Sequence, residues 1–339
     1  MARDKAPIAK LHELKAGQTA VVFALLAEKL RNATRDGKPF FSLRFKDAKQ
    51  TVGAVVWADS TFFKECDASW AVGGFYKIRG TLAAHEKYGL QLELLQIRDV
   101  KPDDAADGFR DTDFYERSRF ESDAMFAELR QLVEAEVKGV PLRTLIIGLL
   151  DVHAEALQRL PASPKHYYPF PGGWLEHTLN VARNCLWLAD QYAARFPELT
   201  PPLNRDLVFA GAVLHDFGRV AEVTTGPPGH LSDATIPGRL LGHVQLGRDL
   251  LRDAAKAVPE LDAETVLLLE HIVLTHLSLP EWGSPRLPMI PEVLLIHHAD
   301  DLDAKFEMYA RHLSRDASEG PFTDRDPILG KPLLKQRGV

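Results

Sequence analysis

The sequence predicts a multi-domain protein in which an N-terminal all-β barrel precedes an all-α helical bundle. Between residues 12 and 100 the apolar segments are short, alternate with polar residues and are rich in β-branched and aromatic side chains. From about Phe114 onward, apolar residues instead recur every three or four positions, which is the period of a helix. We therefore expect a barrel domain at 12–100, a polar linker at 101–113, a helical domain at 114–314 and a loosely ordered tail at 315–339.

The composition is that of an ordinary globular protein, with 45% hydrophobic and 26% charged residues in 339. No apolar run reaches the roughly 18 residues of a membrane span, and the first residues lack the apolar region of a signal peptide. The two cysteines, Cys66 and Cys185, fall in different predicted domains, so we expect no disulfide framework. These features predict a cytoplasmic protein that does not bind membranes.

The charge is divided unevenly along the chain. Residues 1–100 contain 16 Lys and Arg against 11 Asp and Glu, a balance of +5, whereas the remainder has 25 against 36, a balance of −11. A basic module beside an acidic, histidine-rich one is compatible with a polyanion-binding domain attached to a metal-binding domain. Random surface charge explains this fact alone about equally well.

Five segments of the first domain have the character of strands, and Asp36-Gly37 is a hairpin signal between the first two. Five strands in about 90 residues are typical of the small oligonucleotide/oligosaccharide-binding (OB) barrel. The strand segments are TAVVFALLAEKL, FFSLRFKD, TVGAVVWA, FYKIRGTLAA and YGLQLELLQIRDV.

Aromatic and basic side chains are interleaved along these strands, as in proteins that bind single-stranded nucleic acid by stacking and charge. Strand alternation places Phe41, Leu43 and Phe45 in the core and leaves the residues between them facing outward. Core packing accounts for most of the other rings. The predicted nucleic-acid-binding residues are Phe40, Arg44, Lys46, Trp57, Arg79 and Tyr88.

Ten of the 13 histidines lie beyond residue 160, and His215-Asp216 stands at the end of an apolar helix that Asn204 can cap. Imidazoles and carboxylates gathered from several helices typically hold one or two divalent metals for phosphoester hydrolysis. An isolated His-Asp pair is usually a surface feature, but here further candidate ligands surround it in the sequence. They are His177, His243, His271, His276, His297 and Asp300.

Helical spacing separates some of these candidates. His297 and Asp300 share one face of the last helix, with Asp303 near the same edge in a position to support a ligand. His271 and His276 are five residues apart, about 140° around an ideal helix, so we expect only one of them to be a ligand. Arg219, Arg239 and Lys305 are candidates to offset charge that develops in the reaction.

Five stretches of this half resemble the successive motifs of the HD-domain metal-dependent phosphohydrolases: GGWLEHTLNVARN, VLHDFGRV, GRLLGHVQLG, HIVLTHLSLPEWGSP and HHADDLDAK. Their order and wording are most similar to the YhaM-type 3′→5′ exoribonucleases, in which an OB barrel precedes an HD domain. The resemblance covers roughly residues 12–310.

This resemblance implies a primary metal set of His177, His215, Asp216 and Asp300, with the catalytic carboxylate Asp216 bridging to a second ion that His243 and His276 complete. It thus favours His276 over His271. The chain departs from the family pattern at His276-Leu277-Ser278, where the family usually has His-His-Gly. This difference lies in the site expected for the second ion. The chain also has Gly218-Arg219 where the family has a lysine, and arginine keeps that positive charge.

The resemblance implies hydrolysis of single-stranded RNA, and of DNA as a second substrate, with Mn²⁺ as the first choice of ion and Fe²⁺, Co²⁺, Ni²⁺ or Mg²⁺ as alternatives. Two other functions stay open at this point. One is a nucleotide phosphohydrolase or cyclic-nucleotide phosphodiesterase whose barrel serves assembly into a homo-oligomer. The other is a non-catalytic nucleic-acid-binding protein with a vestigial site.

Overall fold

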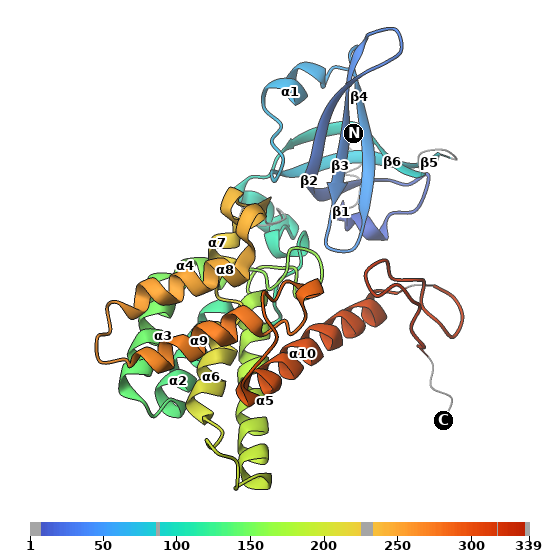
Figure 1. Ribbon diagram of the computed structural model, residues 1–339. Helices are drawn as coiled ribbons and strands as arrows, with labels where there is room; N and C mark the ends of the chain where they lie inside the picture. The colour runs from blue at the N-terminus through green and yellow to red at the C-terminus, as the bar shows by residue number, and fades with distance from the viewer. Residues whose placement is uncertain (1–7, 86–88, 225–232, 317, 336–339) are drawn as a thin grey trace. The chain divides into compact units, whose positions relative to one another are not determined.

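The computed structural model describes residues 8–85, 89–224, 233–316 and 318–335. The chain divides into two compact units, and the first long segment of the chain passes from one to the other between Glu116 and Arg117. The prediction of a β-barrel followed by a helical bundle is confirmed (Figure 1). Among the described residues, no helix has both the length and the apolar character needed to cross a bilayer.

In its described residues, the first unit contains six strands and one short α-helix. A hairpin turn between β2 and β3 has Gly37 at φ +77°, as the Asp36-Gly37 signal predicted. The elements are β1 (Ile8–Ala9), β2 (Thr19–Ala33), β3 (Pro39–Lys46), β4 (Thr51–Trp57), α1 (Phe63–Ala68), β5 (Phe75–His85) and β6 (Gly89–Asp99).

The strand order identifies this unit as an OB fold. The strands pair in the order β2-β3-β4-β6-β5, and β5 pairs again with β2, so the sheet closes into a five-stranded barrel. A register shift between Leu26 and Glu28 lets the long β2 bend, so that its first half pairs with β5 and its second half with β3. Phe41, Leu43 and Phe45 point into the barrel, as alternation predicted.

The segment 101–113 differs from the predicted linker. It forms two 3-10 helices, η2 (Pro102–Asp107) and η3 (Asp111–Asp113), and belongs to the first unit. Its polar, acidic composition was misleading because Asp104 is buried between two basic residues of the barrel, Lys77 at 2.9 Å and Arg98 at 2.6 Å. Phe109 and Phe114 pack against Phe23 of β2 and extend the apolar core of this unit.

The second unit is a helical bundle. It also contains a two-stranded ribbon, β7 (Val223–Thr224) with β8 (Asp233–Ala234), and a 3-10 turn, η4 (Pro280–Trp282). Its helices are α2 (Ser122–Glu136), α3 (Val140–Val152), α4 (Ala154–Arg159), α5 (Gly173–Arg195), α6 (Arg205–Leu214), α7 (Arg219–Glu222), α8 (Ile236–Ala255), α9 (Ala263–Thr275) and α10 (Pro291–Arg315).

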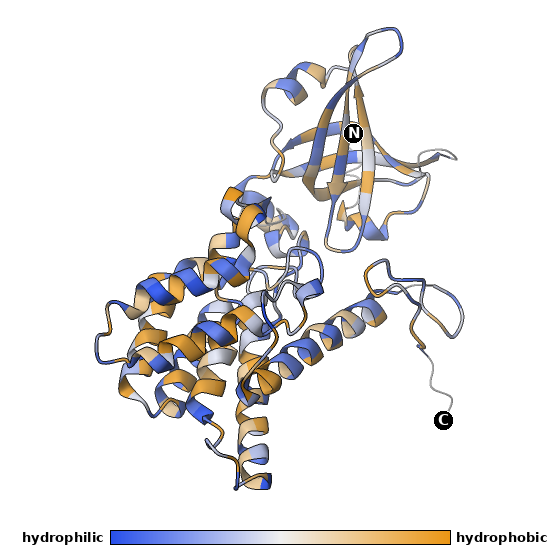
Figure 2. Ribbon diagram, in the orientation of Figure 1, coloured by the Kyte–Doolittle hydropathy of each residue, from blue (hydrophilic) through white to orange (hydrophobic). Residues whose placement is uncertain are grey.

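Helix α6 is central in this bundle because residues 207–214 are all buried, so the helix is enclosed on every side. Asn204 caps its first turn by accepting a hydrogen bond from the Leu207 amide, as predicted. Helices α5, α9 and α10 pack on α6, and Figure 2 shows their hydrophobic residues gathered on the inner faces. The ends of these helices bring the candidate ligands together.

The predicted loose tail at 315–339 is partly ordered in its described residues. Phe322 and Leu334 form an isolated antiparallel bridge, and the Lys335 ammonium group pairs with Asp316 at 2.8 Å. Thr323 and Leu333 are buried. The sequence did not predict this order because the contacts join residues 10 to 20 positions apart and follow no helical period.

Candidate metal centre and nucleic-acid face

Six of the predicted ligands come together in the second unit. His177 lies near the start of α5, while His215 and Asp216 follow the last residue of α6. His243 is on α8, His276 caps the C-terminus of α9, and Asp300 is on α10. Candidate ligand atoms form two groups that share Asp216: His177, His215 and Asp216 in one, and Asp216, His243 and His276 in the other.

His177 is held between two carboxylates of α10. Its Nδ1 donates to Asp303 Oδ2 at 2.8 Å, and its Nε2 lies 3.1 Å from Asp300 Oδ1. Burial alone would lower the pKa of His177, but Asp300 and Asp303 outweigh it and raise that pKa to about 10. A proton on Nε2 accounts for the contact with Asp300 and for the raised pKa, and a divalent ion bound between these two atoms would replace that proton.

His215 and His276 are oriented by the helix ends on which they stand. In each ring, Nδ1 donates to a backbone carbonyl three residues earlier: Ala212 O at 2.8 Å for His215 and Val273 O at 2.9 Å for His276. A carbonyl can only accept, so both rings have their lone pair on Nε2, which is the tautomer of a metal ligand. Burial lowers the pKa of His215 to about 4, so this ring stays neutral.

His243 depends on a break in α8. Gly242, at φ +73°, interrupts the helical backbone just before it. The amide of His243 then donates to Glu222 Oε1 at 3.1 Å, and His243 Nδ1 lies 3.4 Å from the same oxygen. His243 Nε2 consequently faces Asp216 Oδ1 at 3.0 Å.

The two oxygens of Asp216 face different surroundings. The Tyr167 hydroxyl donates to Oδ2 at 3.1 Å, and Arg219 Nε lies 3.4 Å from that oxygen, while Oδ1 points to His243 and His276. Burial alone would raise the pKa of Asp216, but Arg219 and His243 hold it well below its usual range. Asp216 is therefore ionised, with Oδ1 directed into the cluster.

These residues fit divalent metal ions. Among the described residues, Nε2 of His215 and His276 is buried without a hydrogen-bond partner, whereas Nε2 of His177 and His243 and Oδ1 of Asp216 face other candidate ligands at 3.0–3.1 Å. Leaving buried polar atoms unpaired costs about 1–3 kcal/mol each, so such a group is expected only where a ligand satisfies it. Imidazoles with carboxylates suit Mn²⁺, Fe²⁺, Co²⁺, Ni²⁺ or Zn²⁺ better than Mg²⁺.

Two residues of this site were missed by the sequence reasoning, Tyr167 and Glu222. Tyr167 lies in the irregular segment before α5, and its ring centroid is 5.0 Å from that of His177. Glu222 binds both Arg219 Nη1 at 2.7 Å and His243; burial alone would raise its pKa, but His243 and Arg219 lower it to about 2. The paired tyrosines of PKHYYPFPGG, just ahead of the His177 helix, were the available signal.

The remaining predicted residues lie outside the cluster. His271 Nε2 accepts from the amide of Met289, and His297 Nδ1 donates to the His276 carbonyl at 2.7 Å, which stabilises the chain after that ligand. Lys305 is exposed and pairs with Asp301 at 2.7 Å. Arg239 is exposed in the first turn of α8, and no described hydrogen bond or ion pair joins it to the cluster.

The outer surface of β3 and β4 carries much of the predicted nucleic-acid face. Phe40 lies opposite Trp57 with ring centroids 5.0 Å apart, and Trp57 is 50% exposed. Arg44 is exposed beside Glu28 at 3.3 Å, and Lys46 follows it on the same outward register. Arg79 is exposed on β5, and Tyr88 lies outside the described residues.

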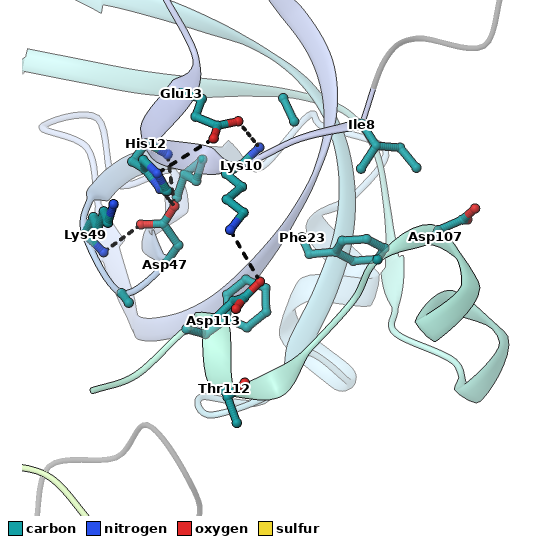
Figure 3. A pocket seen from close by; sticks show the side chains of 15 residues that line it. Ile8, Lys10, His12, Glu13, Phe23, Asp47, Lys49, Asp107, Thr112 and Asp113 are labelled. Atoms are coloured by element: carbon teal, nitrogen blue, oxygen red, sulfur yellow. Dashed lines mark hydrogen bonds and ion pairs between the residues drawn. The ribbon is translucent and has the colours of Figure 1, made fainter. Parts of the chain in front are cut away.

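A pocket of about 410 Å³ also lies within the first unit (Figure 3). The segments 8–13, 47–49 and 107–114 provide most of its lining. Its charged groups are largely paired with one another: His12 Nδ1 lies 2.6 Å from Asp47 Oδ2, and Lys10 lies 3.8 Å from Asp113. The first pair joins the residues after β1 to the end of β3, and the second joins them to the segment 101–113, so their main effect is to hold this unit together.

Comparison with known proteins agrees with this geometry. Residues 174–305 match the family described as HD domain. This match and the two ligand groups together indicate a metal-dependent phosphohydrolase. Residues 174–305 thus form an HD domain, which follows an OB fold in this chain.

Similar solved structures align with part of the chain. The second OB-fold domain of replication protein A from Methanococcus maripaludis is 18% identical, with 28% of this chain and 95% of that chain covered and a TM-score of 0.22. A small single-stranded DNA-binding protein from Streptomyces coelicolor is 17% identical, with 26% and 96% covered and a TM-score of 0.21. The OB assignment itself rests on the strand order given above.

Proposed function

We propose that this protein is a metal-dependent 3′→5′ exoribonuclease that hydrolyses single-stranded RNA, and single-stranded DNA as a second substrate, to nucleoside 5′-monophosphates. The observation that carries the proposal is the pair of ligand clusters sharing Asp216 in an HD domain. The outer surface of β3 and β4 supports a single-stranded substrate because it combines the exposed ring of Trp57 with basic side chains. The 3′→5′ direction and the preference for RNA rest on the motif resemblance to the YhaM-type enzymes.

The residues of the centre would have different chemical roles. Bound divalent ions would polarise the scissile phosphate and lower the pKa of a water molecule. His177, His215, Asp216 and Asp300 would hold one ion, and Asp216, His243 and His276 the other; we propose Mn²⁺. Arg219, which Glu222 holds beside Asp216, offers a charge-assisted donor to a phosphate oxygen.

Digestion of a 5′-labelled single-stranded RNA with Mn²⁺ tests this proposal. We expect a ladder of progressively shorter labelled products. Immediate release of the labelled 5′ nucleotide would mean the opposite polarity, and cleavage of a circular strand would rule out an exonuclease. Faster hydrolysis of mononucleotides or cyclic nucleotides than of oligonucleotides would instead support the nucleotide phosphohydrolase.

Asp216→Ala connects the activity to the centre. We expect this variant to keep its helical circular dichroism while it loses both bound metal and hydrolysis, because Asp216 belongs to both ligand groups. Asp253→Ala is the matched control, since Asp253 is exposed on α8 and pairs with Lys256. Normal turnover by Asp216→Ala after loss of its metal would mean that the site is wrongly assigned.

A further inference from the structure

An exposed tryptophan lies on the loop that follows the candidate ligand His276. Trp282 ends the 3-10 turn η4, and its side chain is 51% exposed. One contact fixes the indole: its ring stacks on His297 with centroids 5.9 Å apart and planes inclined by 26°. A large aromatic ring that is held in place and still open to solvent is a typical anchor for a ligand.

Trp282 is connected to the candidate ligands in two ways, along the chain and through its stacking partner His297. The chain that carries it starts at His276, six residues earlier. Its stacking partner His297 donates to the His276 carbonyl at 2.7 Å and lies one helical turn before Asp300 on α10. The indole is thus attached to two of the elements that supply ligands, α9 and α10.

The surroundings of the ring suit a nucleotide. Lys305 Nζ lies 5.9 Å from the indole centroid; it pairs with Asp301 at 2.7 Å and retains further N–H donors for a phosphate. Leu302 of α10 and Leu279 of the same loop are exposed and apolar. Rings and apolar side chains beside a cation are the combination that binds bases of single strands.

The indole is not needed to shape its own loop. The Trp282 amide donates to the Leu279 carbonyl at 3.0 Å, and the Ser284 amide donates to the same carbonyl at 3.2 Å. Gly283 at φ +111° then reverses the chain. These backbone features remain when the side chain changes, so exposure of the ring is not a by-product of the turn.

We propose that Trp282, supported by His297 and Lys305, is a stacking subsite for the base of one of the two 3′-terminal nucleotides of the substrate. This inference rests on the proposed function and adds to it how the strand end is held. Because any base has a face that can stack, the subsite recognises the presence of a base rather than its identity. The terminal phosphodiester is then presented to the centre by a base contact as well as by phosphate contacts.

The test is a double-mutant cycle that combines Trp282→Leu in the protein with removal of one base from the substrate. Single-stranded RNA oligonucleotides that lack the terminal or the penultimate 3′ base are compared with the intact strand, measuring KM and kcat with Mn²⁺ and Kd in EDTA. On the intact strand we expect Trp282→Leu to bind about 5- to 150-fold more weakly than wild type, which is the range for one stacked base. One abasic strand should cost the wild-type protein a similar factor, and Trp282→Leu should lose nothing further on it.

Two other variants complete the design. Trp282→Phe should recover most of the loss, because a phenyl ring still stacks. Trp187→Leu removes a comparably exposed tryptophan about 15 Å along α5 from His177 and should behave as wild type. Independent losses that multiply on both abasic strands, or wild-type behaviour of Trp282→Leu, would overturn the subsite.

Titration with adenosine 5′-monophosphate separates this inference from the proposed function. If no strand is hydrolysed, the exonuclease proposal fails, but the subsite still predicts that Trp282→Leu binds this nucleotide about 5- to 150-fold more weakly than wild type. Equal affinity of the two proteins for the nucleotide would overturn the subsite, whatever the result with strands.

Discussion

Replacing Gly218 with alanine should remove the ion of one ligand group and leave that of the other. Gly218 has ordinary helical angles, φ −62° and ψ −14°, so alanine is allowed by the backbone. The obstacle is space, because a Cβ atom there would lie 1.9 Å from the His243 carbonyl oxygen and 2.4 Å from the Gly247 amide nitrogen. Since a normal contact is about 3.5 Å, α8 would have to move by at least about 1.5 Å.

That movement reaches the ligands. His243 Nε2 lies 3.0 Å from Asp216 Oδ1, and metal–imidazole bonds tolerate deviations of only about 0.2 Å. We therefore expect Gly218→Ala to lose the ion of the Asp216–His243–His276 group while keeping the other. Overpacking of this kind costs about 1–3 kcal/mol, which lowers the Tm of a unit this size by about 2–12 °C.

Gly148→Ala is the matched control because no atom lies within 4 Å of its added Cβ in the middle of α3. The same chemical change there should raise stability by about 0.5–1 kcal/mol. Metal content by mass spectrometry, metal titration by calorimetry and thermal unfolding check both variants. Two tightly bound ions and an unchanged Tm in Gly218→Ala would refute the reasoning.

Three further predictions concern other parts of the chain. Tyr167→Phe removes the hydroxyl that donates to Asp216 Oδ2, so we expect about a tenfold loss of turnover, corresponding to one hydrogen bond to a charged group, with unchanged folding by circular dichroism. Trp57→Ala should weaken binding of a long single strand by about 5- to 150-fold in anisotropy, and a normal Kd would remove this ring from the strand path. Hydrogen bonds with Arg98 are the main reason why the pKa of Asp104 in the folded protein lies below its usual value. The free energy of unfolding in urea should therefore include a contribution from this residue that is present above about pH 4 and lost below it. Asp104→Asn should flatten this pH dependence.

The fold was accessible from sequence because its signals are local. Alternation along residues 40–45 gave the inward and outward sides of β3, and Asn204 marked the start of α6. What failed was non-local: the acidic residues after the barrel were predicted as a linker, although Asp104 pairs with basic residues of β5 and β6. No local pattern contains that pairing.

The candidate site divides in the same way. Motif order indicated which histidines and aspartates to consider, and six of them lie together. Gly218 is small because α8 passes directly against it, and no spacing in the sequence reveals that contact. Tyr167 and Glu222 act through contacts across the bundle, so only the three-dimensional arrangement reveals them.

The two groups that share Asp216 are not equivalent, and this has a consequence for how the protein would respond to metal supply. Each group has one histidine oriented by a backbone carbonyl and one oriented by a carboxylate, but Asp300 adds a carboxylate only beside His177 and His215. The extra negative charge makes that position the stronger one for a divalent cation. We expect it to fill first as the free ion becomes available, with the His243–His276 position filling only at higher concentration. The proposed hydrolysis with two ions would then follow the local abundance of the ion, and the half-loaded protein would be its resting form in a metal-poor cell.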